Sequence, residues 1–276
     1  MSDRVSLGAI FRPQLPPERL RNAVRAAEET GLDELWLWED CFLESGFSTA
    51  AAALAWSEHL TVGIGLLPAP LRNVAITAME IATLDRLFPG RLRVAVGHGV
   101  QEWMGQVGAR APSPLSLMRE YQEALRRLLA GDVVSTDGEY VHLDQVQLGW
   151  PPHRTPAILM GAVGPKSMAL CGEVADGILI DSITTAAGIA EARALMAPGW
   201  LASGRSGVPI VAAYTRTYDE HDRELPVDLV ARTVNERIGA GVSSVILQPS
   251  PTTTEIESYF AVIADEVRPR IHASLI

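Results

Sequence analysis

The chain contains almost no lysine. Of its 23 basic residues, 22 are arginine, and Lys166 is the single lysine. Lys166 stands in segment 160–167 (MGAVGPKS), where glycines predict a tight turn before a helix. Main-chain N–H groups and the dipole at a helix start favour an anion, so the segment predicts a phosphate site. An ordinary loop cation remains an alternative. A Schiff-base lysine is a further one, disfavoured because a lysine past the turn would be solvated.

Cysteine and long apolar runs are scarce as well. Cys41 and Cys171 are too few for a disulfide framework and have no zinc-ligand spacing, and no run of apolar residues reaches membrane-spanning length. Residues 1–4 carry no hydrophobic signal region, so we expect a cytoplasmic protein. A net charge of -10 argues against nucleic acid or an anionic membrane as partner, which leaves a small molecule.

Several common catalytic motifs are missing. The six histidines are scattered and form no His-Glu-x-x-His pattern, so we expect no metal site. The turn before Lys166 lacks the spacer of a phosphate-binding P-loop, and Gly97-His98-Gly99 lacks the third glycine of a dinucleotide fingerprint. No Gly-x-Ser-x-Gly elbow is present either. Zinc hydrolases, P-loop enzymes and serine hydrolases of that type are therefore disfavoured.

Short β-rich runs alternate with helical runs along the whole chain. We expect strands near 5–11, 34–38, 60–67, 92–96, 157–160, 177–180, 210–214 and 244–247. Eight strand–helix units in about 250 residues predict a (β/α)8 TIM barrel, with an open doubly wound sheet as the alternative. Segment 132–156 breaks the alternation and predicts a small hairpin inserted before the fifth strand. No linker divides the chain, so we expect one domain over 1–276.

In such a barrel the chemistry lies where the strands end. The second predicted strand ends in WEDC (38–41), the third in GLLP (65–68) and the fourth in GHGVQEW (97–103). The fifth is followed by the Lys166 turn and the sixth by Asp181. Glycine in three of these turns lets the backbone approach a flat or phosphorylated ligand closely.

Several of these segments occur together in one known family. Segments 31–40 (GLDELWLWED) and 81–91 (IATLDRLFPGR), followed in order by VGHG (96–99), EY (120–121), GEY (138–140), GAVGPK (161–166) and ADG (175–177), resemble the bacterial luciferase-like monooxygenase superfamily. The resemblance covers about residues 5–181. It implies a barrel that binds a flavin, or the deazaflavin coenzyme F420, at the C-terminal mouth, and a homodimer is plausible from the family.

The resemblance also implies roles for individual residues. Asp40 would contact the tricyclic ring, and Gly65-Leu66 would be a non-proline cis peptide that props the ring. Further cofactor contacts would come from Gly97, His98, Gly99, Gly161, Ala162, Gly164, Pro165, Lys166 and Ser167, the last six around the cofactor phosphate.

The segment GHGVQEWM (97–104) is similar to the corresponding segment in the F420-dependent branch of the family. We therefore expect hydride transfer between F420 and a small organic substrate. An FMN-dependent monooxygenase is the first alternative, and a cofactor-binding protein without turnover is the second. A sugar-phosphate dehydrogenase of that branch would carry histidine beside Asp40, where this chain has Cys41.

Each candidate side chain also has an ordinary structural interpretation. His98 or Glu102 would be the catalytic proton donor, but His98 could face solvent and Glu102 could be a carboxylate in the first turn of a helix. Asp40 could cap the segment after its strand. Substrate-pocket roles are predicted for Trp38, Cys41 and Trp103, each of which could be plain packing.

Overall fold

Eight parallel strands close into a barrel in the computed structural model, which describes residues 5–271. Residues 1–4, on which the expectation about a signal region depends, lie outside the described residues. The barrel strands are β1 (Ser6–Phe11), β2 (Glu34–Leu37), β3 (Thr61–Pro68), β4 (Leu92–Gly97), β7 (Ile158–Gly161), β8 (Gly177–Ile180), β9 (Ile210–Arg216) and β10 (Ser244–Gln248). The predicted TIM barrel is thereby confirmed.

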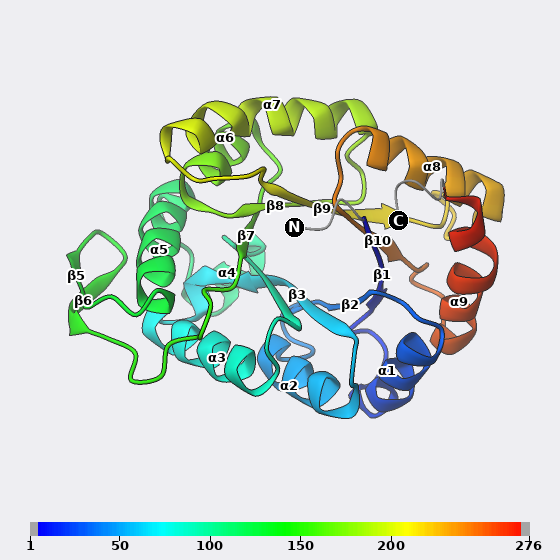
Figure 1. Ribbon diagram of the computed structural model, residues 1–276, viewed down its shortest axis with the longest axis horizontal. Helices are drawn as coiled ribbons and strands as arrows, with labels where there is room; N and C mark the ends of the chain where they lie inside the picture. The colour runs from blue at the N-terminus through cyan, green and yellow to red at the C-terminus, as the bar shows by residue number, and fades with distance from the viewer. Residues whose placement is uncertain (1–4, 272–276) are drawn as a thin grey trace.

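Helices cover the outside of the barrel, as Figure 1 shows. They are η1 (Pro17–Arg19), α1 (Leu20–Glu29), α2 (Gly46–Trp56), η2 (Ala69–Leu71), α3 (Val74–Leu87), α4 (Gln101–Gln106), α5 (Pro114–Leu129), α6 (Pro165–Val174), α7 (Ala186–Ala202), α8 (Val227–Gly239), α9 (Ile256–Val262), η3 (Ile263–Val267) and η4 (Arg268–Arg270). None of these helices in residues 5–271 has the length and apolar character needed to cross a bilayer.

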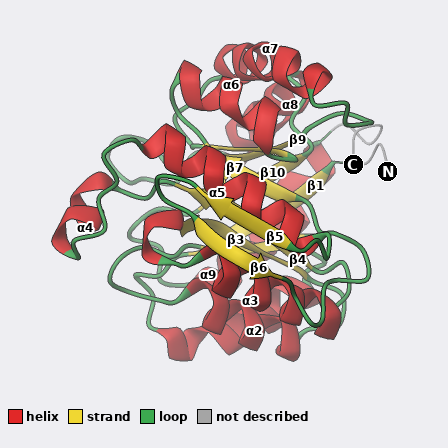
Figure 2. Ribbon diagram, turned by 90° about the vertical axis from the view of Figure 1, so that its left-hand side faces the viewer, coloured by secondary structure: helices red, strands yellow, loops and turns green. Residues whose placement is uncertain are grey.

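The predicted insertion is a two-stranded antiparallel hairpin, β5 (Val134–Asp137) and β6 (His142–Val146). It takes no part in the barrel, because β4 pairs directly with β7. Figure 2 shows the hairpin beside α5 and shows α4 projecting beyond the barrel. The fifth barrel strand therefore follows the inserted segment, as the broken alternation indicated.

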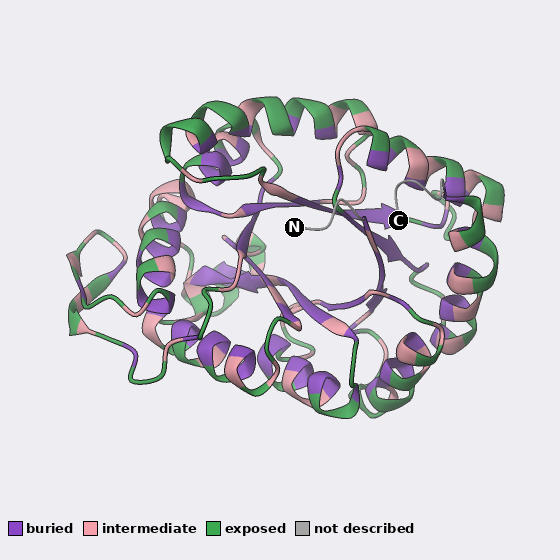
Figure 3. Ribbon diagram, in the orientation of Figure 1, coloured by how far each residue is buried: buried purple, intermediate pink, exposed green. Residues whose placement is uncertain are grey.

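The buried residues form two layers, and Figure 3 shows that the strands are buried while the helices expose their outer faces. The larger layer lies between strands and helices; in α1 it takes Leu20, Ala23, Val24 and Ala27, the residues at helical spacing. The smaller layer fills the barrel and includes Trp36, Leu179 and Tyr214. Its partly buried neighbours Trp38 and Leu66 lead from this inner core to the cavity described next.

Candidate functional site

A cavity of about 370 Å³ opens at the carboxyl ends of the strands, where a barrel of this kind carries its chemistry. Nine of the residues predicted from the sequence line it: Trp38, Asp40, Gly65, Leu66, His98, Gly99, Trp103, Gly161 and Ala162. They come from four different strand ends and from α4. The barrel therefore brings together residues that lie more than 120 positions apart in the chain.

Other predicted residues do not line this cavity. Gly97 is buried beneath Leu66, Cys41 is partly exposed beside the cavity, and Glu102 is exposed in the first turn of α4. Gly164, Pro165, Lys166 and Ser167 lie at the start of α6, just past the cavity wall.

The side chain of Leu66 forms the cavity floor. A Cβ built on Gly97 or on Gly161 would lie only 2.6 Å or 2.4 Å from a methyl carbon of Leu66, so both positions must be glycine for the leucine to lie where it does. The Gly65–Leu66 peptide bond is cis, as the resemblance implied, and a second cis bond joins Cys41 to Phe42, which the sequence did not indicate.

Three acidic residues line the cavity, namely Glu39, Asp40 and Asp181. No residue that lines it in the described chain is lysine or arginine. Burial raises the pKa of the Asp40 carboxyl, while Gln14 and the Arg12 guanidinium oppose the rise. A phosphorylated group would therefore find no cationic side chain within the cavity itself.

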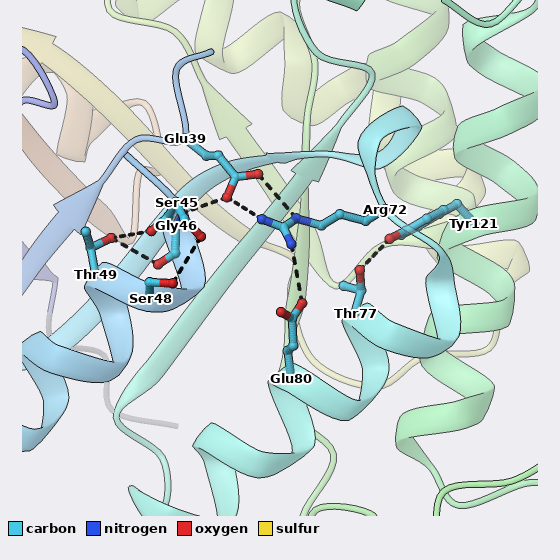
Figure 4. Close-up of polar contacts among 9 residues, drawn as sticks. All are labelled: Glu39, Ser45, Gly46, Ser48, Thr49, Arg72, Thr77, Glu80 and Tyr121. Atoms are coloured by element: carbon cyan, nitrogen blue, oxygen red, sulfur yellow. Dashed lines mark hydrogen bonds and ion pairs between the residues drawn. The ribbon is translucent and has the colours of Figure 1, made fainter. Parts of the chain in front are cut away.

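Glu39 is held by partners from neighbouring segments, as Figure 4 shows. Arg72 Nη2 lies 2.5 Å from Glu39 Oε2, which also accepts the main-chain N–H of Gly46 at 2.6 Å. Arg72 further pairs with Glu80 at 3.5 Å. This network joins the ends of β2 and β3 to α2 and α3, so we interpret Glu39 as a residue that fixes the loops around the cavity.

The ring of His98 is oriented by the backbone next to it. Its Nδ1 lies 2.9 Å from the carbonyl oxygen of Gly99, which can only accept a hydrogen bond. The neutral ring therefore carries its proton on Nδ1 and keeps Nε2 as a proton acceptor. Nε2 has no hydrogen-bond partner within residues 5–271. Among the residues predicted to be catalytic, His98 is the one in the cavity wall.

The start of α6 has the geometry expected of an anion site, but the Lys166 side chain lies toward α5 and does not line the strand-end cavity. Ser167 Oγ donates to the Gly164 carbonyl at 2.8 Å and accepts the Gly164 N–H at 3.2 Å. The main-chain N–H groups of Lys166 and Ser167 have no partner in the described chain. Lys166 shares a helix face with Leu170 and Glu173 and lines a separate cavity of about 340 Å³ against α5.

Tyr214 is the main cavity residue that the sequence interpretation missed. It lies at the end of the seventh predicted strand, whereas the candidate residues come from the ends of the second to sixth strands. Its hydroxyl donates to the carbonyl oxygen of Gly65 at 2.5 Å. An aromatic residue with a polar tip at an inward position near a strand end is the signal that could have found it.

A flat tricyclic group fits these surroundings. The cavity is within the size range of small-molecule sites, and Leu66, Trp38, Trp103 and Leu179 give it apolar walls. The indole Nε1 of Trp38 is buried next to the Tyr214 phenol and makes no hydrogen bond of normal geometry within residues 5–271. In the same residues no three His, Cys, Asp or Glu side chains gather to hold a metal ion.

Comparison with known families agrees with this geometry. The family model described as luciferase-like monooxygenase matches residues 6–243. The chain belongs to this family.

Two curated relatives illustrate its similarity to named proteins. The chain is 30% identical over 178 residues to 5,10-methylenetetrahydromethanopterin reductase of Methanolobus tindarius, covering 64% of this chain and 54% of that protein. It is 27% identical over 182 residues to F420-dependent glucose-6-phosphate dehydrogenase of Nakamurella multipartita, covering 61% and 53%. The chain thus spans about half the length of these curated relatives.

Two solved structures share the fold. Coenzyme F420-dependent tetrahydromethanopterin reductase from Methanopyrus kandleri superposes with a TM-score of 0.84 at 21% identity, covering 98% of this chain and 100% of that one. The oxygenating constituent of 3,6-diketocamphane monooxygenase from Pseudomonas putida, in complex with FMN, gives 0.79 at 15% identity, covering 98% and 99%. At these identities the similarity establishes the barrel alone.

Proposed function

We propose that this protein is an oxidoreductase that transfers a hydride between coenzyme F420 and a small organic substrate. The observation that supports it most is the cavity at the strand ends, whose lining includes seven of the residues that the family resemblance singled out. The F420-dependent relative named above favours this cofactor.

The residues of the chain would divide the work as follows. Leu66 would support the cofactor ring, and Trp38 and Trp103, which also line the cavity, would exclude water from it. When bound, reduced F420 supplies the hydride. His98 would exchange, through Nε2, the proton that accompanies hydride transfer to or from the substrate. We do not extend the proposal to sugar phosphates, since the cavity wall carries carboxylates and no cationic side chain.

Titration of the purified protein with F420 and, separately, with FMN tests the proposal through the fluorescence of each cofactor. We expect micromolar or tighter binding of F420, and oxidation of bound reduced F420 by at least one member of a panel of uncharged carbonyl compounds. No binding at micromolar levels would contradict the proposal. Tight binding without oxidation by any acceptor would instead indicate a carrier or sensor.

An FMN-dependent monooxygenase is the second candidate, because the matching family model is described as luciferase-like monooxygenase and the 3,6-diketocamphane monooxygenase named above is in complex with FMN. Reduced flavin reacts readily with oxygen, whereas reduced deazaflavin does not. Oxygen uptake by the protein with reduced FMN, together with weak F420 binding, would select this alternative.

We propose further that the main-chain N–H groups at the start of α6 bind the cofactor phosphate, and that the Lys166 side chain turns from its place beside α5 to contact it. Replacing Lys166 with methionine should weaken cofactor binding about ten- to a hundredfold, because one charge-assisted contact is lost. Arg127→Met removes the same charge from the exposed side of α5 and should change the dissociation constant less than about twofold. An unchanged constant in Lys166→Met would show that the ammonium points elsewhere.

We propose a homodimer that forms through α2 and α3. Helix α2 has no charged residue, and on α3 the side chains of Ile76, Met79 and Leu87 are 50%, 54% and 65% exposed. Helix α3 carries Glu80, which pairs with Arg72, the buried Asp85, and Arg86, so few free charges oppose the contact of two chains of net charge -10. Sedimentation should give a dimer that Met79→Lys dissociates, while Leu201→Lys on α7 leaves it intact. A monomeric wild type would contradict this.

A further inference from the structure

The Tyr214 side chain crosses the inside of the barrel to reach the backbone of a distant strand. Its hydroxyl donates to the Gly65 carbonyl oxygen at 2.5 Å, across 149 residues of sequence. Tyr214 is 8% exposed, and its exposed edge lines the cavity. The hydrogen bond therefore ties β9 to the segment of β3 that carries the cavity floor.

Rigid neighbours hold the phenol ring in place. Trp36 and Trp38 meet it edge to face, with ring centroids 6.2 Å and 5.6 Å away. The backbone carbonyl of Tyr214 accepts a hydrogen bond from Arg237 Nη1 at 3.0 Å, and Arg237 also donates to two carbonyls in the loop after β8. Arg237 is itself buried. The position of the hydroxyl is thus fixed independently of any ligand.

The acceptor of this hydrogen bond, the Gly65 carbonyl group, is equally constrained. A Cβ on Gly65 would lie 2.2 Å from the Tyr214 hydroxyl, so the close approach requires glycine. The next residue, Leu66, fits between Gly97 and Gly161 with no space for a methyl group on either. Any displacement of the Gly65 carbonyl therefore also moves the Leu66 side chain.

From these contacts we propose that Tyr214 is a positioning residue, whose O–H holds the Gly65 carbonyl and so sets the height of Leu66 beneath the bound ring. The inference rests on the proposed function in that the ring is taken to be that of F420. Tyr214 does not serve as a proton donor to substrate, because its proton is engaged by Gly65. Burial also raises the pKa of the phenol, which keeps it protonated.

Tyr214→Phe removes the hydroxyl and keeps the ring. Tyr218→Phe is the matched control: Tyr218 follows the same strand, is also buried, and its hydroxyl accepts a hydrogen bond from Gln248 at 2.9 Å without lining the cavity. We expect the dissociation constant of F420 to rise about tenfold in Tyr214→Phe and less than twofold in Tyr218→Phe. A purely structural role would lower the melting temperature of both variants and leave both constants unchanged.

A measurement without cofactor separates this inference from the proposed function. In ¹H–¹⁵N spectra of the ligand-free protein, the amide signals of Leu66, Gly97 and Gly161 should shift in Tyr214→Phe and stay in place in Tyr218→Phe. Unshifted signals, or equal F420 affinity in the two variants, would overturn the positioning role. Shifted signals in a protein whose wild type binds no F420 would support it and would overturn the proposed cofactor alone.

Discussion

Replacing Gly172 with alanine should lower the free energy of unfolding by about 3 kcal/mol, at the upper end of what overpacking costs. Gly172 lies on α6 where it meets α7, and a Cβ there would be 2.1 Å from the backbone carbonyl oxygen of Met196. Backbone atoms of a helix cannot rotate away as a side chain can, so the two helices must move apart. The higher helix propensity of alanine, about 1 kcal/mol, only partly offsets this.

Urea unfolding followed by circular dichroism measures the effect, with Gly239→Ala as the control. Gly239 is also helical, at the end of α8, but a Cβ there meets nothing within 4 Å. That variant should be as stable as the wild type or slightly more stable. If the two alanine variants unfold at the same urea concentration, α6 and α7 do not pack as closely as the position of Gly172 indicates.

The barrel could be predicted from the sequence because its signals are local. Each strand–helix unit carries its own alternation of patterns, and right-handed crossovers leave few ways to arrange eight of them. Strand Gly177–Ile180 has its expected bounds. Helix α1 begins only at Leu20, because the Pro17–Arg19 turn before it is 3₁₀.

Contacts across the barrel could not be predicted in this way. The Tyr214–Gly65 hydrogen bond depends on the tilt and stagger of the closed sheet, which no local pattern records. The direction of Lys166 is a similar case: the sequence predicts a helix start beside the cavity. Whether position 166 faces the cavity or α5 depends on where the first helical turn begins.

Replacing Gly161 with alanine should abolish most cofactor binding while leaving the fold nearly as stable as before. The new Cβ would lie 2.4 Å from a terminal methyl carbon of Leu66. Unlike the backbone contact at Gly172, this neighbour is the flexible end of a side chain, so it can yield at little cost to the fold. The Leu66 side chain cannot move toward Gly97 either, because there is no space for a methyl group on that side.

Leu66 can therefore yield only toward the cavity, where it takes the place of the ligand. We expect the dissociation constant of F420 to rise at least about tenfold, equivalent to about 1.4 kcal/mol, with a melting temperature within a few degrees of the wild type. Adding Leu66→Val shortens the colliding side chain and should restore part of the affinity, so the two substitutions should not be additive. Additive losses would mean that Gly161 contacts the cofactor directly and that Leu66 does not form the floor beneath it.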